Sequence, residues 1–288
     1  MAALRLSLCM IVRDEAAMLP DLLASVAGLW DELVVADTGS TDGTVALLAA
    51  AGARIVHHPW DDDFAAARNA SLDAARGRWI LCLDADERVS PALREQIRAL
   101  LDDPRAGAAT VVMRNALPGG HHRESSLLRL FRNDPAIRFR HRIHEDVLDD
   151  VERHLERTGL VLRHLTGFVE HLGYVREVAA DRAKKARDEA LLRRTLAEDP
   201  DDLYCWFKLL ELARFWEDEA LGDEAAAGAA QRLAGALPPA LRRTLARNPW
   251  SGELAVLIAR RRGAEPATAL AWLDGVAERI CPGPAWHL

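Results

Sequence analysis

The chain has 288 residues, of which 50% are hydrophobic and 28% are charged, and its formal net charge is −7. This composition is typical of a globular protein with one large domain or two smaller ones, and it argues against a disordered, collagen-like or disulfide-framed chain. The negative charge disfavours a general nucleic-acid binder, which normally carries a positive field. No apolar stretch approaches the roughly 20 residues that a membrane-spanning helix requires.

The four cysteines, Cys9, Cys82, Cys205 and Cys281, are far apart and form no CxxC pair. Scattered cysteines favour reduced, buried thiols over disulfides or structural zinc. The apolar stretch 6–12 is followed at once by charged residues, so it is interpreted as a buried strand rather than a signal peptide. We therefore expect a cytoplasmic protein, free or peripheral to the membrane, with no integral membrane segment.

The first half of the chain alternates predicted strands with predicted helices. The expected strands are 4–12, 32–36, 54–57, 79–83 and 109–113, and the expected helices are 16–28, 45–51, 63–75 and 91–101. Ser90 and Pro91 are a typical N-cap and first helical residue. Alternation with short connections predicts an α/β fold with a mostly parallel sheet flanked by helices.

From about residue 176 onward, apolar residues recur at helical spacing, which predicts an α-helical C-terminal region. Pro249 and Pro282 stand 33 residues apart in similar surroundings, each with a tryptophan shortly after it. That interval is close to the helix-turn-helix repeat of about 34 residues. The pattern fits degenerate tetratricopeptide-like repeats and an irregular helical bundle equally well. We expect two domains, 1–178 and 179–288.

Acidic residues follow two of the predicted strands, and in parallel sheets ligands bind beyond the carboxyl ends of the strands. Asp84 and Asp86 stand two residues apart on a turn, where carboxylate oxygens suit Mg²⁺ or Mn²⁺ bridged to phosphate. The alternative is a solvated acidic loop. Asp37 opens the segment 37–44, whose glycines allow a ligand to approach the backbone closely. The alternative there is a tight turn in which Thr41 or Asp42 caps a helix.

Several segments in order resemble the motifs of family 2 glycosyltransferases with the GT-A fold. They are LCMIVRDE at 8–15, DTGSTDGT at 37–44, DFAAARN at 63–69 and LDADE at 83–87. The segments 129–133, 142–145 and 170–174 resemble the bacterial branch with a tetratricopeptide-like helical tail, so the resemblance covers roughly 4–210. It implies an inverting transfer of a sugar from a nucleotide diphosphate sugar, with a UDP-sugar preferred. The acceptor would be a hydroxyl or thiol on a glycan, lipid-linked or peptide substrate.

The resemblance also implies roles for individual residues. Asp37 contacts the base of the donor, while Asp84 and Asp86 bind ribose and the divalent metal, and Asp86 is favoured over Asp84 as the direct metal ligand. The acid that deprotonates the acceptor is matched best by Glu145 and next by Asp146; the alternative is a surface acid. The residues expected to bind the donor are Val12, Arg13, Glu15, Asp37, Gly39, Ser40, Asp42, Arg68, Asn69, Asp84 and Ala85.

Other candidates keep two interpretations each. His171 is a third metal ligand or diphosphate contact, or else a structural histidine. Arg129 and Arg132 contact phosphate or acceptor, or form a solvated rim. His144 orients the catalytic acid or is simply exposed. Arg68 and Asn69, beside their donor-binding interpretation, would otherwise brace the sheet.

Two rival functions come from other classes. A nucleotidyltransferase should carry a glycine-rich basic loop directly after the first strand, and this chain has Arg13-Asp14-Glu15 there instead. The second rival is a non-catalytic nucleotide-sugar or partner-binding protein that makes a protein contact through its helical tail. The presence of Asp84, Asp86 and Glu145 argues against it.

Overall fold

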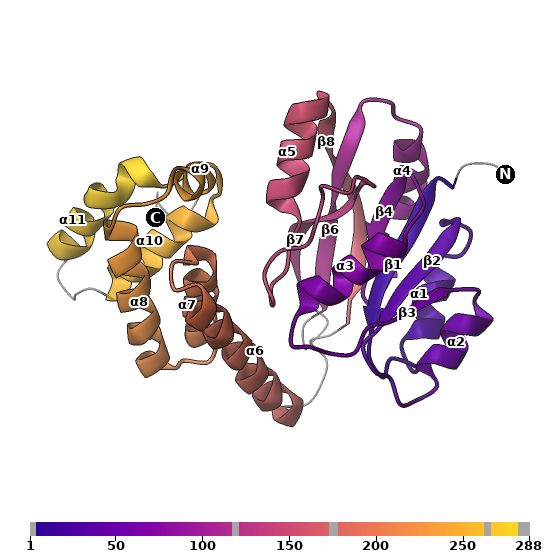
Figure 1. The fold of residues 1–288 in the computed structure, drawn as a ribbon, viewed down its shortest axis with the longest axis horizontal. Coiled ribbons are helices and arrows are strands. Elements are labelled where there is room, and N and C mark those ends of the chain that lie inside the picture. The colour runs from indigo at the N-terminus through magenta and orange to yellow at the C-terminus, as the bar shows by residue number, and fades with distance from the viewer. Residues whose placement is uncertain (1–3, 117–120, 173–177, 262–265, 282–288) are drawn as a thin grey trace. The chain divides into compact units, whose positions relative to one another are not determined.

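A computed structural model describes residues 4–116, 121–172, 178–261 and 266–281 (Figure 1). The chain divides into two compact units, Met1–Val178 and Ala179–Leu288. Within the described ranges, none of the helices combines the length and the apolar character of a membrane span.

The first unit is built on one eight-stranded sheet with the order β3-β2-β1-β4-β7-β6-β8-β5. The strands are β1 (Leu6–Val12), β2 (Glu32–Asp37), β3 (Arg54–His57), β4 (Trp79–Cys82), β5 (Glu87–Val89), β6 (Ala106–Ala116), β7 (His122–Arg132) and β8 (Val161–His171). Strands β3, β2, β1 and β4 are parallel, as the alternation predicts. The other half is mixed, because β7 runs antiparallel to both β4 and β6.

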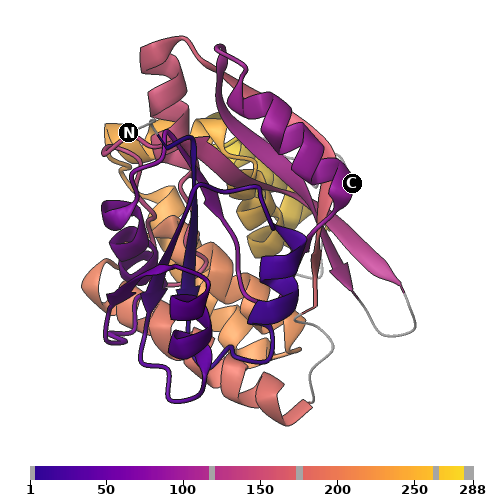
Figure 2. The ribbon, with the colours of Figure 1, turned by 90° about the vertical axis from the view of Figure 1, so that its right-hand side faces the viewer.

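Strand β6 lies between β7 and β8, and its pairing with both strands is irregular. Its pairing with β7 shifts register between Ala109 and Thr110, and its pairing with β8 shifts at two places. Such bulges bend a strand and increase its local twist. Figure 2 shows β6 and β7, in magenta to pink, running together as a long two-stranded ribbon.

Helices cover both faces of the sheet, so the first unit has two hydrophobic cores. The helices are α1 (Leu19–Ser25), α2 (Thr44–Ala50), α3 (Phe64–Ala74), α4 (Pro91–Leu101) and α5 (Leu148–Thr158). Successive residues of β1 alternate between the cores: Leu8 and Met10 face one, and Cys9 faces the other. This alternation explains the continuous apolar run of β1, which is buried on both faces.

Of the two helix caps predicted from the sequence, one is confirmed and the other is wrong. Ser90 accepts a hydrogen bond from the backbone N–H of Leu93, with Pro91 next to it. The N-cap of α2 is Gly43, so the alternative with Thr41 or Asp42 at that position is wrong by one or two residues. Asp42 instead accepts hydrogen bonds from the N–H groups of Thr44 and Ala16, and so ties the helix start to the loop after β1.

The second unit is helical, as expected from residue 176 onward. Its helices are α6 (Val178–Glu198), α7 (Leu203–Phe215), α8 (Glu219–Ala234), α9 (Pro239–Arg247), α10 (Trp250–Arg261) and α11 (Pro266–Val276). Asp202 and Asp218 cap α7 and α8. At Gly228 the two helices approach so closely that a Cβ atom would lie 2.5 Å from the ring of Trp206.

Candidate active site

The loops after β1 and β2 form one hydrogen-bonded unit at the carboxyl edge of the sheet. The carboxylate of Asp14 accepts hydrogen bonds from the backbone N–H of Thr41, at 2.7 Å, and from that of Asp42, at 3.3 Å. The backbone N–H of Asp14 donates to Ser40, and that of Glu15 donates to Thr44. Asp14 has a φ of 55°, an uncommon value for a residue other than glycine, and these bonds hold it there. Asp14 is not among the donor-binding residues predicted from the sequence, although it lies within the family-like segment 8–15.

Asp37 ends β2 as a buried carboxylate that is 5% exposed. One of its oxygens accepts a hydrogen bond from the N–H of Ser40, and the other lies 3.6 Å from Nδ1 of His57 on the neighbouring strand. Gly39 has a φ of 107°, which favours glycine and permits the tight turn between them. The buried carbonyl of Val12 accepts from the backbone and side chain of Thr38 and closes this corner.

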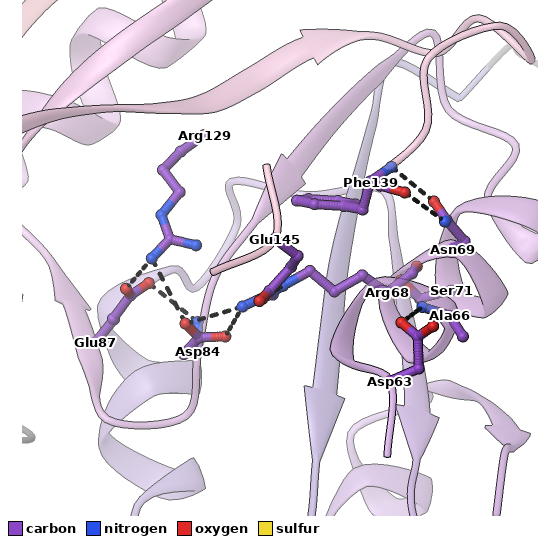
Figure 3. Close-up of polar contacts among 10 residues, drawn as sticks. All are labelled: Asp63, Ala66, Arg68, Asn69, Ser71, Asp84, Glu87, Arg129, Phe139 and Glu145. Carbon is purple, nitrogen blue, oxygen red and sulfur yellow. Dashed lines mark hydrogen bonds and ion pairs between the residues drawn. The ribbon is translucent and has the colours of Figure 1, made fainter. Parts of the chain in front are cut away.

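Asp84 follows β4 and lies between two arginines (Figure 3). Nη2 of Arg68 donates to both of its oxygens, at 2.9 and 3.2 Å, and Nη2 of Arg129 lies 3.5 Å from Oδ2. Burial alone would raise the pKa of Asp84, but the two arginines outweigh it and lower the pKa to about 2. The carboxylate is therefore ionised at neutral pH and already has its charge balanced.

Glu87 is a site residue that sequence reasoning missed. It begins β5, is 1% exposed, and accepts hydrogen bonds from the N–H of Asp84 at 3.0 Å and from Arg129 at 2.5 Å. Its burial and the nearby charge of Asp84 raise its pKa to about 7 in spite of Arg129. Glu87 stands within the quoted LDADE segment, but the residue pattern alone did not indicate its burial.

Arg68 also reaches the predicted catalytic acid. Its Nε donates to Oε1 of Glu145 at 2.5 Å, and the two side chains are 8% and 12% exposed. Asn69, the next residue on α3, exchanges two hydrogen bonds with the backbone of Phe139, at 3.0 and 2.9 Å. These contacts hold the segment 139–145 against α3, so Arg68 lies among the acids while Asn69 braces the segment that carries Glu145 (Figure 3).

Asp86 and His171 form a second pair at the same edge. Nε2 of His171 lies 3.3 Å from Oδ2 of Asp86, and the N–H of Leu172 donates to the carbonyl of Asp86. The hydrogen bond to Asp86 is the main reason why the pKa of His171 is raised. Within the residues that the structure describes, no group of three or more histidine, cysteine or acidic side chains is arranged to hold a metal.

The structure does not bring Arg132 to this edge. Strand β7 places Arg132 opposite Trp79 at the start of β4, where it stacks 4.2 Å from the indole ring and donates to the carbonyl of Ala106. Arg132 thus braces the opposite end of the sheet, whereas Arg129, three residues earlier, lies beside Asp84.

The remaining predicted residues lie at the margin of the site. Asp146 accepts a hydrogen bond from the N–H of Leu148 at the start of α5. His144 is exposed with a φ of 56°, and Arg13 is exposed after β1. Ala85 is buried, and its carbonyl accepts a hydrogen bond from Arg88.

Comparison with known proteins agrees with this fold. Residues 7–153 match the model of the glycosyl transferase family 2. A TPR repeat-containing protein of Synechococcus elongatus is 44% identical over 210 residues, which are 72% of this chain and 52% of that protein. An uncharacterized glycosyltransferase of Rickettsia bellii is 33% identical over 93 residues, 32% of this chain and 31% of that protein. The S. aureus TarS fragment 1–349, in complex with UDP-GlcNAc, superposes with a TM-score of 0.53 at 16% identity, covering 94% of this chain and 89% of that one.

The fold is that of a GT-A protein, with a helical region after it. The chain belongs to the glycosyl transferase family 2, since the family model matches half of its length. It spans about half the length of the Synechococcus relative and about a third of the Rickettsia one.

Proposed function

We propose that this chain is an inverting, metal-dependent glycosyltransferase that moves a sugar from a nucleotide diphosphate sugar to a hydroxyl or thiol acceptor. The observation that carries the proposal is the position of Arg68 between two acids. The guanidinium contacts Asp84, in the predicted donor site, and Glu145, the predicted catalytic acid. Donor-binding and proton-accepting carboxylates therefore lie within reach of one reaction centre, as this transfer requires.

The donor would lie along the carboxyl edge of the sheet, with its base and ribose at Asp37 and its diphosphate toward Asp84 and Asp86. The backbone turn around Gly39 and Ser40 allows a ligand to approach closely. The family membership and the fold shared with TarS, which binds UDP-GlcNAc, support a UDP-sugar as donor. Because Asp84 is already paired with Arg68 and Arg129, we assign it to hydrogen bonds with the donor rather than to direct metal coordination.

The residues present fit a divalent cation at Asp86 and His171. Oδ2 of Asp86 and Nε2 of His171 lie 3.3 Å apart, and both side chains are partly exposed. One carboxylate oxygen and one imidazole nitrogen suit Mn²⁺ or Mg²⁺ when diphosphate oxygens and water complete the coordination. A bound cation would stabilise the negative charge that grows on the departing diphosphate.

Glu145 would accept the proton of the acceptor. Arg68 engages Oε1 and thereby fixes the carboxylate, and Oε2 would take the proton of the acceptor hydroxyl or thiol. Asp146 is the weaker candidate, because its carboxylate accepts the N–H of Leu148 at the start of α5. A carboxylate fixed near the sugar can act as a general base for an acceptor that attacks from the face opposite the leaving group. Attack from that face inverts the configuration at the sugar carbon.

For the acceptor we propose only its chemical class, and for the second unit only a general role. A glycan, a lipid-linked sugar or a peptide would each supply the hydroxyl or thiol. We assign nucleotide-sugar chemistry to residues 1–178 and a protein contact to residues 179–288. The similarity to a TPR repeat-containing protein supports this division.

The test is release of nucleoside diphosphate from a panel of nucleotide sugars, with Mn²⁺ or with a chelator. We expect release with at least one donor, its loss with chelator, and its loss in Asp86→Ala. Asp102→Asn serves as the control, because Asp102 is an exposed carboxylate paired with Arg5 away from the site. Failure to bind any nucleotide sugar would overturn the proposal.

A further inference from the structure

Asn115 connects the candidate metal site to the β6–β7 ribbon. It lies near the end of β6, where the sheet register pairs it with His171 on β8 and with Arg123 on β7. Its Oδ1 is 2.8 Å from Nδ1 of His171, and its Nδ2 donates to the carbonyl of Arg123 at 3.3 Å. Asn115 is absent from the motifs that resemble the family.

The contact with Arg123 determines which way the amide of Asn115 faces. A backbone carbonyl only accepts hydrogen bonds, so the NH₂ group must face Arg123, and Oδ1 then faces the imidazole. Oδ1 is likewise only an acceptor. Nδ1 of His171 must therefore carry a proton in this contact, so Nε2 is the nitrogen that offers a lone pair whenever the ring is neutral.

The ring orientation that follows is the one a metal ligand needs. Nε2 faces Oδ2 of Asp86, 3.3 Å away, and donates to it while the ring is protonated. In the neutral ring the lone pair of Nε2 and the carboxylate oxygen lie where a divalent cation would replace that proton, since metal binding releases the protons of its ligands. Metal-binding histidines in general donate their other ring N–H to an acceptor that fixes tautomer and orientation, and Asn115 occupies that place here.

We propose that Asn115 is a positioning residue that holds His171 as the Nδ1–H tautomer and so presents Nε2, together with Asp86, to a divalent cation. The proposal rests on the metal-dependent function given above. It links that function to the ribbon, because Arg123 fixes the amide of Asn115 from β7.

The test measures the tautomer of His171 and the affinity for Mn²⁺ separately, both on the full chain. Long-range ¹H–¹⁵N correlation on the metal-free protein, recorded at a pH where the His171 ring is neutral and with its signals assigned from His171→Gln, should show the Nδ1–H form. Asn115→Leu, which removes the acceptor, should give a mixture of tautomers. Asn115→Asp, which keeps an acceptor, should restore the Nδ1–H form.

Mn²⁺ affinity, followed by electron paramagnetic resonance with UDP present, is the second measurement. We expect Asn115→Leu to weaken Mn²⁺ binding by about 10–100-fold, and Asn115→Asp to recover most of it. Ser126→Ala, on the exposed part of β7, is the control for disturbance of the ribbon.

Three outcomes overturn the proposal in different ways. If Asp86→Asn loses Mn²⁺ but Asn115→Leu binds it as the wild type does, the role of Asn115 fails and the metal-dependent function stands. If the wild type and Asp86→Asn bind Mn²⁺ equally, the metal site itself fails, and the role of Asn115 fails with it. An Nε2–H tautomer in the wild type would also contradict the role of Asn115.

Discussion

Nε of Arg68 lies 2.5 Å from Oε1 of Glu145, and this contact joins α3 to the segment that precedes α5. The same guanidinium donates to Asp84 beyond β4. One buried cation therefore serves two acids that are 61 residues apart in the chain and belong to different parts of the proposed reaction. Its removal should affect both stability and activity, and the two effects can be measured separately.

The first prediction concerns Arg68→Ala. Removing one partner of a buried ion pair typically costs about 3–5 kcal/mol, because the remaining charge loses its compensation. We expect a loss of this size in the free energy of unfolding, measured by urea denaturation. The control is Arg5→Gln, since Arg5 and Asp102 form an exposed pair that should contribute about 0–1 kcal/mol. Equal losses in the two variants would show that Arg68 does not hold the acids together.

The second prediction distinguishes Glu145 from Asp146. A general base contributes about 10²–10⁴-fold to the rate, so Glu145→Gln should lower kcat by that factor while the affinity for UDP changes little. Asp146→Asn should lower kcat far less, since the Asp146 carboxylate caps the N–H of Leu148. Initial transfer rates and UDP titrations give both quantities. A larger loss in Asp146→Asn would reverse the assignment of the base.

The third prediction concerns pH and Asp150. Burial would raise the pKa of Asp150, but hydrogen bonds from Arg140, Arg153 and the backbone of Arg138 outweigh it and lower the pKa below 3.8. The charged carboxylate therefore stabilises the fold above pH 3.8, and this stabilisation is lost as the pH falls through the folded-state pKa.

Asp150→Asn should accordingly lower the free energy of unfolding by about 1.5–3 kcal/mol at neutral pH, the usual range for hydrogen bonds to a charged group. The difference from the wild type should shrink as the pH falls below 3.8. Urea denaturation across a pH series measures it. A difference that stays constant down to the lowest pH would mean that the charge of Asp150 is unimportant.

The fourth prediction concerns two glycines of the helical unit. Gly228→Ala would place a Cβ atom 2.5 Å from the ring of Trp206, and such overpacking typically costs about 1–3 kcal/mol. Gly275 on α11 has open space within 4 Å, so Gly275→Ala should stabilise its helix by about 0.5–1 kcal/mol. Thermal unfolding of the two variants should shift in opposite directions. Shifts of the same sign would contradict the close approach of α7 and α8.

The first four parallel strands and the acids beyond them could be predicted from sequence because local signals define them. Apolar runs buried on both faces predict such strands, and carboxylates at their ends gather at one edge of the sheet. Strands β7 and β8 were not predicted, since stretches such as His122–Ser126 and Arg163–Gly167 interrupt their apolar character.

Other features of the site depend on register and burial, which no local pattern reports. Arg129 and Arg132 look alike in the sequence, but the antiparallel pairing of β7 with β4 sends one to Asp84 and the other to Trp79. The place of Glu87 likewise depends on its burial between Arg129 and the turn after β4.

The bulges in β6 have a consequence for the dimensions of the active site. Only residues 83–86 separate the end of β4 from the start of β5, yet β7, β6 and β8 lie between those two strands in the sheet. So short a connection can close only if the sheet curls, and the register shifts of β6 provide the bend. Arg129 reaches Asp84 through the direct pairing of β7 with β4, whereas the curl brings β8, which carries His171, to the turn with Asp86. The curvature of β6 thus sets the distance between Asp84, which follows β4, and His171, which ends β8. A change that straightened β6 would move these two parts of the donor site apart without altering any residue in them.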